Sequence, residues 1–177
     1  SYQISREEGI KNAIRIMKET GVDALKIEGG AEIADTIKGI IHAGIPVMGH
    51  LGLTPQSIHK FGGYGLRAKT ESEAKELMDD ALCLEQVGCF GITLEKVPAQ
   101  LATQVTQAVN CAIIGIGAGN GTNGQILVYA DMLGLTHEFK PKFLRQYAHL
   151  YDTITEAVGH YIADVKSTDF PNAQESY

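Results

Sequence analysis

Charged side chains stand near the ends of two short apolar runs, where they could transfer protons or bind a metal ion. Lys26 and Glu28 belong to the run 22–28 (VDALKIE), and Glu95 closes the run 89–95 (CFGITLE). Each run is typical of a buried strand, on which side chains two residues apart point the same way. Lys26 and Glu28 therefore share one face, and a carboxylate there can act as a general base or a metal ligand. The alternative is a solvated lysine–glutamate pair.

His50 and Glu95 each allow two interpretations. His50 lies in the run 46–51 (PVMGHL), at the same level of its strand as the other charged ends. A single histidine in an apolar strand is either a catalyst or, more often, a hydrogen-bonded core residue. Glu95 is either a partly buried general base or a surface carboxylate at the start of a loop, because Pro98 follows it shortly afterwards.

A glycine cluster over 115–124 (GIGAGNGTNG) suggests a nucleotide site. Gly119, Gly121 and Gly124 satisfy the pattern G-x-G-x-x-G, which is typical of dinucleotide binding. That pattern requires a helix immediately afterwards, whereas the segment 125–128 (QILV) is typical of a strand. We therefore expect a loop that allows close backbone approach to a small anion or a carboxylate, and no dinucleotide.

Strand-like and helix-like segments alternate along the chain. Capping boxes at 5–8 (SREE) and 70–73 (TESE) predict two helix starts, and a long amphipathic helix is predicted over 142–166. Strands are predicted at 22–28, 46–51, 89–95, 111–116 and 125–130.

This alternation predicts an α/β fold with a parallel sheet. A (β/α)8 TIM barrel needs eight strands and typically about 250 residues, so we expect about the last five βα units of one. A flavodoxin-like open sheet is the alternative. The barrel is favoured because polar residues end several successive strands, as they do around a barrel mouth. Residues 1–166 are predicted to form this partial barrel with its C-terminal helix, and 167–177 a loose polar tail.

The composition excludes several classes of partner. The net charge is −6 with no basic block, so nothing favours nucleic acid or an anionic membrane. No apolar run approaches the roughly 20 residues that span a bilayer. Three cysteines without C-x-x-C spacing are typical of buried thiols in a reducing compartment, and we expect a cytoplasmic protein.

Four stretches of the chain resemble the ketopantoate hydroxymethyltransferase family in order and spacing. They are VDALKIEGG (22–30), PVMGHLGLTPQSIHKFGGY (46–64), ITLEKVP (92–98) and IIGIGAGNGTNGQILVYADMLGL (113–135). The resemblance implies a (β/α)8 barrel that transfers a hydroxymethyl group from 5,10-methylenetetrahydrofolate to 3-methyl-2-oxobutanoate. The product is 2-dehydropantoate, in pantothenate biosynthesis. It also implies a divalent metal, usually Mg²⁺, that assists enolate formation, and a large homo-oligomer.

The resemblance assigns a role to each of the four residues. Glu95 matches the proton acceptor, Lys26 the lysine at the substrate's carboxylate and oxo end, and Glu28 an acidic residue at the metal. His50 matches a catalytic histidine at the mouth.

The remaining metal ligands are expected in an N-terminal section that this sequence lacks. Three hypotheses follow from that departure. The chain is part of an active enzyme, or a truncated, inactive homologue that forms oligomers, or a related metal-dependent 2-oxo acid lyase.

Overall fold

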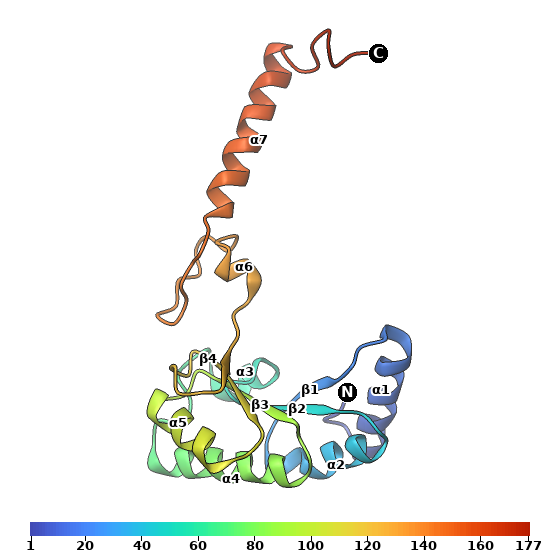
Figure 1. The fold of residues 1–177 in the computed structure, drawn as a ribbon, viewed down its shortest axis with the longest axis vertical. Helices are drawn as coiled ribbons and strands as arrows, with labels where there is room; N and C mark the ends of the chain where they lie inside the picture. Colours follow the sequence, from blue (N-terminus) through green and yellow to red (C-terminus); the bar gives the residue numbers. More distant parts are fainter. The chain divides into compact units, whose positions relative to one another are not determined.

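One parallel sheet of five strands organises the first part of the chain (Figure 1). The computed structural model describes residues 1–177. The strands are β1 (Leu25–Glu28), β2 (Val47–Gly52), β3 (Gly91–Glu95), β4 (Ala112–Ile116) and β5 (Gly124–Gln125). Their order across the sheet equals their order in the sequence, and every neighbouring pair is parallel. The predicted α/β class is confirmed. The flavodoxin-like alternative is wrong, because that fold places its first strand between the second and third.

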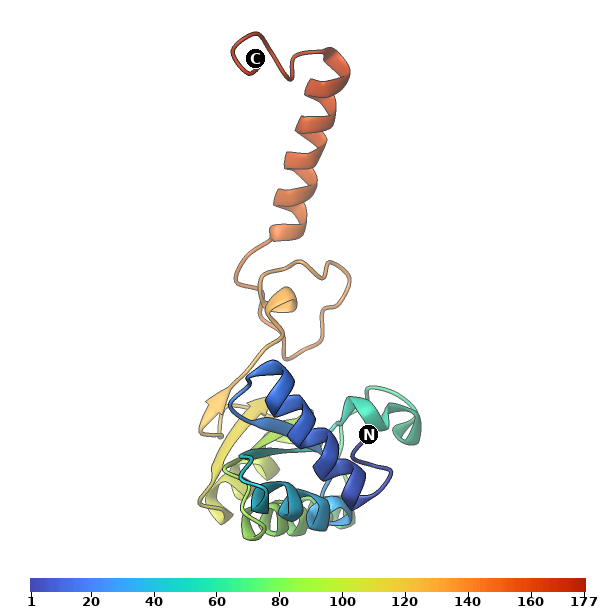
Figure 2. The same cartoon turned by 90° about the vertical axis from the view of Figure 1, so that its right-hand side faces the viewer.

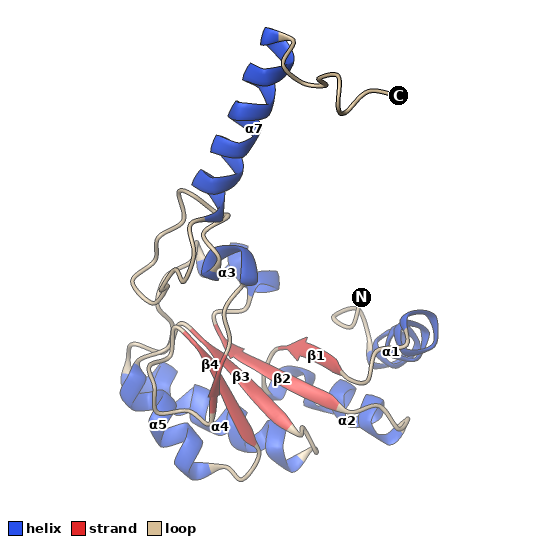
Figure 3. Ribbon diagram, turned by 45° about the horizontal axis from the view of Figure 1, so that its top comes forward, coloured by secondary structure: helices blue, strands red, loops and turns tan.

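Helices connect the strands, and the longer ones cover one face of the sheet. The helices of this part are α1 (Arg6–Thr20), α2 (Ala34–His42), α3 (Ile58–Phe61), α4 (Glu71–Gln86) and α5 (Ala99–Ala108), with short 3-10 turns η1 (Ala31–Ile33) and η2 (Pro55–Ser57). Figure 3 shows α2, α4 and α5 along the same side of the strands. Figure 2 shows α1, in dark blue, next to α2, with which it is in contact.

Both predicted capping boxes start helices. The Ser5 hydroxyl accepts a hydrogen bond from the N–H of Glu8 at the start of α1. At the start of α4 the exchange is reciprocal: the Thr70 hydroxyl accepts from the N–H of Glu73, and the Glu73 carboxylate accepts from the N–H of Thr70. These contacts satisfy N–H groups that have no partner inside the helix.

The core lies between the sheet and its helices. Alternate strand residues point toward this layer, and its central members, all fully buried, are Ile37, Ile40, Val47, Leu84, Ile92, Leu94, Val105 and Ile113. Gly49 allows α4 to approach, because a Cβ at this position would lie 2.7 Å from Cδ1 of Leu84. The opposite face of the sheet is less covered, and Lys26 and Ala112 are exposed on it. The polar strand residues point to that less covered face.

The chain divides into two compact units, Ser1–Ile126 and Leu127–Tyr177. The strand predicted over 125–130 is wrong beyond its first residue. β5 ends at Gln125, and α6 (Tyr129–Met132) follows. Short apolar runs do not distinguish a strand from a helix by periodicity alone.

The long helix of the second unit begins later than predicted. α7 spans Leu150–Ser167 rather than 142–166. The N–H groups of Tyr147, Leu150 and Tyr151 donate to the carbonyls of residues 132–134, at the C-terminal end of α6. Tyr147, which precedes α7, thus has a backbone partner outside its own stretch of chain. No helix of the structure is long and apolar enough to cross a membrane.

Burial makes the Cys89 thiol unreactive. Cys89 is 4% exposed, and burial raises the pKa of its thiol to about 11. Only about one thiol in a thousand would then be thiolate at pH 8. We expect iodoacetamide at pH 8 to modify the partly exposed Cys83 well before Cys89 in the native protein, as measured by peptide mass spectrometry. Equal labelling rates without unfolding would contradict this expectation.

Candidate active site

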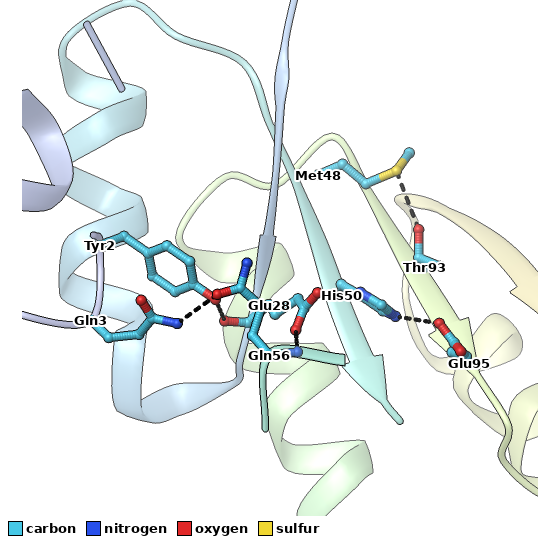
Figure 4. Close-up of polar contacts among 8 residues, drawn as sticks. All are labelled: Tyr2, Gln3, Glu28, Met48, His50, Gln56, Thr93 and Glu95. Atoms are coloured by element: carbon cyan, nitrogen blue, oxygen red, sulfur yellow. Dashed lines mark hydrogen bonds and ion pairs between the residues drawn. The ribbon is translucent and has the colours of Figure 1, made fainter. Parts of the chain in front are cut away.

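Three polar side chains form a row across the C-terminal ends of β1, β2 and β3 (Figure 4). Glu28 pairs in register with His50, and Glu95 lies two residues beyond Thr93, the partner of His50. Nδ1 of His50 lies 3.7 Å from Oε1 of Glu28, and Nε2 lies 3.2 Å from Oε2 of Glu95. The parallel strands thus bring together three of the four residues that the sequence singled out.

His50 is the most deeply buried member of the row. Its side chain is 1% exposed, against 15% for Glu28 and 20% for Glu95. The 3.2 Å separation from Glu95 is within hydrogen-bonding distance, but the groups are not aligned, and neither ring nitrogen makes a hydrogen bond. A buried polar group without a partner costs about 1–3 kcal/mol. Catalytic hydrogen bonds are often long or misaligned without substrate and tighten when it binds.

The loop after β2 and the N-terminal residues hold Glu28. Its Oε2 accepts a hydrogen bond of 2.8 Å from the N–H of Gln56. The hydroxyl of Tyr2 donates to the backbone oxygen of Glu28 at 2.9 Å. Burial, together with the charge of Glu28, raises the pKa of Tyr2, which keeps this hydroxyl a donor. The Oε1 atom of Glu28 is left facing His50 (Figure 4).

The backbone around Glu95 is held from both neighbouring strands. Its carbonyl oxygen accepts a hydrogen bond of 2.8 Å from the N–H of Leu53, just after β2. The N–H of Lys96 donates to the oxygen of Ile116 at the end of β4. Lys96 has a left-handed φ of 48°, which turns the chain out of the sheet directly after Glu95. The carboxylate therefore projects from a fixed position at the sheet edge.

Lys26 lies apart from this row. It pairs with Met48, two positions before the level of Glu28 and His50, and it is exposed. Strand alternation places it on the same face as Glu28, as predicted. Lys26 is exposed to solvent and makes no ion pair with Glu28.

The chain by itself does not form a metal centre. No group of three histidine, cysteine, aspartate or glutamate side chains is arranged to hold an ion. Mg²⁺ takes about six oxygen ligands and keeps several waters. Glu28 offers carboxylate oxygens at the sheet edge, and it fits as one ligand of a site that other groups would have to complete.

Sequence reasoning missed two residues that hold Glu28 and one that lies beside the row. Tyr2 and Gln56 contact Glu28, and neither belongs to a pattern that signals this. Thr93 is 1% exposed and donates its hydroxyl to Sδ of Met48 at 3.4 Å. Thr93 could have been found from strand alternation: it lies two residues before Glu95 and therefore shares its face of β3, next to His50 of β2.

The glycine loop after β4 packs against α5. A Cβ at Gly119 would overlap Ala99, and one at Gly121 would overlap Thr103. The side-chain amide of Gln125 donates to the oxygen of Gly119 at 2.8 Å. Close approach to the backbone is needed here, as the sequence indicated, and α5 is one element that approaches. Binding of a small anion or a carboxylate at this loop stays a prediction.

A separate pocket of about 400 Å³ lies between the residues after β1, the loop after β2, and α4. Lys60, Arg67 and Asp80 are among its lining residues, whereas the row of Glu28, His50 and Glu95 is not. Burial raises the pKa of Asp80, whose Oδ1 accepts a hydrogen bond from the N–H of Ala31. Gly29, the residue directly after Glu28, is among the lining residues, so the pocket adjoins the row.

A family model and similar known proteins point to the same family. The model of a family described as ketopantoate hydroxymethyltransferase matches residues 1–173. Three proteins named 3-methyl-2-oxobutanoate hydroxymethyltransferase resemble this chain over 177 residues. The sequence identity is 59% for the protein of Flavobacterium johnsoniae, 59% for that of Christiangramia forsetii and 57% for that of Bacteroides fragilis. Each match covers 100% of this chain and 65% of the relative. The chain thus spans just under two thirds of the length of these relatives.

Proposed function

The chain belongs to the ketopantoate hydroxymethyltransferase family, and we propose that its protein converts 3-methyl-2-oxobutanoate to 2-dehydropantoate in pantothenate biosynthesis. The one-carbon donor would be 5,10-methylenetetrahydrofolate. The observation that carries the proposal is the carboxylate of Glu95, which is partly exposed at the sheet edge and 3.2 Å from a buried histidine. Because the chain spans 65% of its relatives, the activity is proposed for the complete protein.

Glu95 would act as the general base. The C3 hydrogen of a 2-oxo acid lies next to the ketone, so its removal gives an enolate. In the proposed reaction this proton passes to Glu95, and C3 bonds to the methylene carbon of the donor. That carbon is bonded to two folate nitrogens, N5 and N10, and both bonds break: one as C3 bonds to the carbon, the other as water supplies the hydroxyl group. The two nitrogens take up two protons, one removed from C3 and one from the water, which gives tetrahydrofolate. A positioned base of this kind contributes about 10²–10⁴-fold to the rate.

Glu28 and Lys26 would hold the groups around the substrate. We propose Glu28 as one ligand of a divalent metal, with the other ligands outside these 177 residues. When bound, Mg²⁺ supplies Lewis acidity that stabilises negative charge on the oxygen of a 2-oxo acid. Lys26 is exposed on the same face of β1, where its ammonium group can meet the substrate carboxylate. His50 belongs to the same site.

We further propose that the sheet is about five units of a (β/α)8 barrel. Sequential parallel order and helices on one face are the features of such a barrel. The polar row then faces the interior, at the carboxyl ends of the strands where these enzymes carry their active sites. A homo-oligomer is part of the same proposal. α7 supports it, since its own unit leaves Tyr151, Ile154 and Val158 about half exposed.

The test is an assay of the complete protein with both substrates and Mg²⁺. We expect 2-dehydropantoate to form only when 5,10-methylenetetrahydrofolate is present. We also expect the C3 hydrogen of 3-methyl-2-oxobutanoate to exchange with D₂O in the absence of the donor, as followed by NMR. Cleavage of the 2-oxo acid would indicate a lyase instead. Absence of both exchange and product would overturn the proposal.

A further inference from the structure

The imidazole of His50 is enclosed between two carboxylates. Its nitrogens face Glu28 at 3.7 Å and Glu95 at 3.2 Å, and neither gap is wide enough for a water molecule. Both nitrogens are fully buried and lack an aligned hydrogen-bond partner. A small rotation of the Glu95 carboxylate would complete the hydrogen bond from the ring.

Burial separates the roles of His50 and Glu95. His50 is 1% exposed in these residues alone, so any further part of the protein can only bury it more. A ring closed off in this way does not reach a substrate atom. Glu95 is 20% exposed and projects beyond it, so Glu95 can accept a proton from a bound molecule. His50 must therefore act through its neighbours.

The strand register explains why the ring points at the base. Residues 48, 50 and 52 of β2 share one face, and Gly52 pairs in register with Glu95. Gly52 has no side chain, so β2 places nothing beside Glu95 at that level. The ring of His50, two residues earlier on β2, is what reaches Oε2 of Glu95.

We propose that His50 is a positioning residue that fixes the orientation of the Glu95 carboxylate. This inference rests on the proposed function. Once this hydrogen bond is completed, Nε2 of His50 would hold Oε2 of Glu95, which leaves Oε1 to take the proton. Glu28 is held separately by the N–H of Gln56, so the carboxylate proposed at the metal does not depend on this contact. A misplacement of about 1 Å in such a site costs about 10²-fold in rate.

The test compares glutamine, asparagine and leucine at position 50 in the complete protein. The side-chain nitrogen of glutamine takes the place of Nε2, which faces Glu95, and that of asparagine takes the place of Nδ1, which faces Glu28. We expect His50→Leu to lower the rate constant of C3 exchange by about 10–100-fold, with KM for the 2-oxo acid and Mg²⁺ affinity nearly unchanged. His50→Gln should restore most of the rate, and His50→Asn little. His59→Gln, at an exposed histidine of α3, is the matched control.

A double-mutant cycle separates positioning from an independent role. If His50 acts through Glu95, then His50→Leu should add little to the loss caused by Glu95→Gln. Additive losses would overturn the proposal, and so would rescue by His50→Asn but not by His50→Gln.

Crystal structures provide a readout that does not depend on activity. The Glu95 carboxylate should keep its orientation in His50→Gln and leave it in His50→Leu. An unchanged Glu95 in His50→Leu would contradict the inference. If the wild-type protein shows no C3 exchange, the proposed function fails, while these structures still decide whether His50 positions Glu95.

Discussion

Replacing Glu95 with glutamine should nearly abolish C3 proton exchange in the complete protein, with a loss of about 10²–10⁴-fold. The amide keeps the size of the carboxylate and can still contact His50, but it does not accept a proton at neutral pH. The measurement is the disappearance of the C3 hydrogen signal of 3-methyl-2-oxobutanoate in D₂O, followed by NMR at saturating Mg²⁺. Formation of 2-dehydropantoate should fall in parallel.

Metal binding should survive this substitution, because Glu28 and not Glu95 is the proposed ligand. Titration calorimetry with Mg²⁺ and the 2-oxo acid would measure it. Glu19→Gln is the matched control, since this carboxylate on α1 is 61% exposed and pairs only with Arg15 at the surface. Lost metal binding, with exchange unaffected in the metal-saturated variant, would contradict the assigned role of Glu95.

Replacing Gly52 with alanine should be the most damaging small change near the site. Gly52 has a φ of +88°, a conformation that alanine adopts only with strain, and its Cβ would overlap the backbone oxygen of Glu95. That oxygen accepts a hydrogen bond from the N–H of Leu53, so it has little freedom to move. We expect a lower free energy of unfolding and also slower C3 exchange, because the strand that carries Glu95 must shift.

Gly44→Ala isolates the steric part of this effect. Gly44 has nearly the same φ, +86°, but nothing lies within 4 Å of the position of its Cβ. The control should show only the cost of the left-handed conformation, about 1–2 kcal/mol. Gly52→Ala should lose about 1–3 kcal/mol more, as measured by urea denaturation of the complete protein. Equal losses in the two variants would show that the overlap with Glu95 is unimportant.

Local sequence signals predicted most elements of the first unit. Capping at Ser5 and Thr70 depends on hydrogen bonds within four residues, so the sequence alone could place both helix starts. The first four strands lie within the predicted apolar runs, give or take one residue at their ends. A short apolar run between two amphipathic helices is best buried as a strand of a central parallel sheet, so its position in the sequence predicts the strand.

The same signals failed where distant contacts decide the structure. The run 125–130 has the composition of a strand, but only Gly124 and Gln125 pair with β4. The helix predicted from 142 starts at Leu150, and before it the N–H of Tyr147 donates to the carbonyl of Met132, the last residue of α6. The close contacts of the glycine cluster with Ala99 and Thr103 of α5 also appear only in three dimensions.

The sequence by itself determined the family, the α/β class and the chemical types that meet at the sheet edge. Parallel strands make the ends of β1, β2 and β3 neighbours, so Glu28, His50 and Glu95 could be expected near one another. Only the tertiary structure decided that His50 is closed off from solvent with a carboxylate on either side, while Glu95 stays partly open. Burial is a sum over neighbours that are far apart in the chain, and register depends on how whole strands pair. Neither quantity can be read from the residues next to His50.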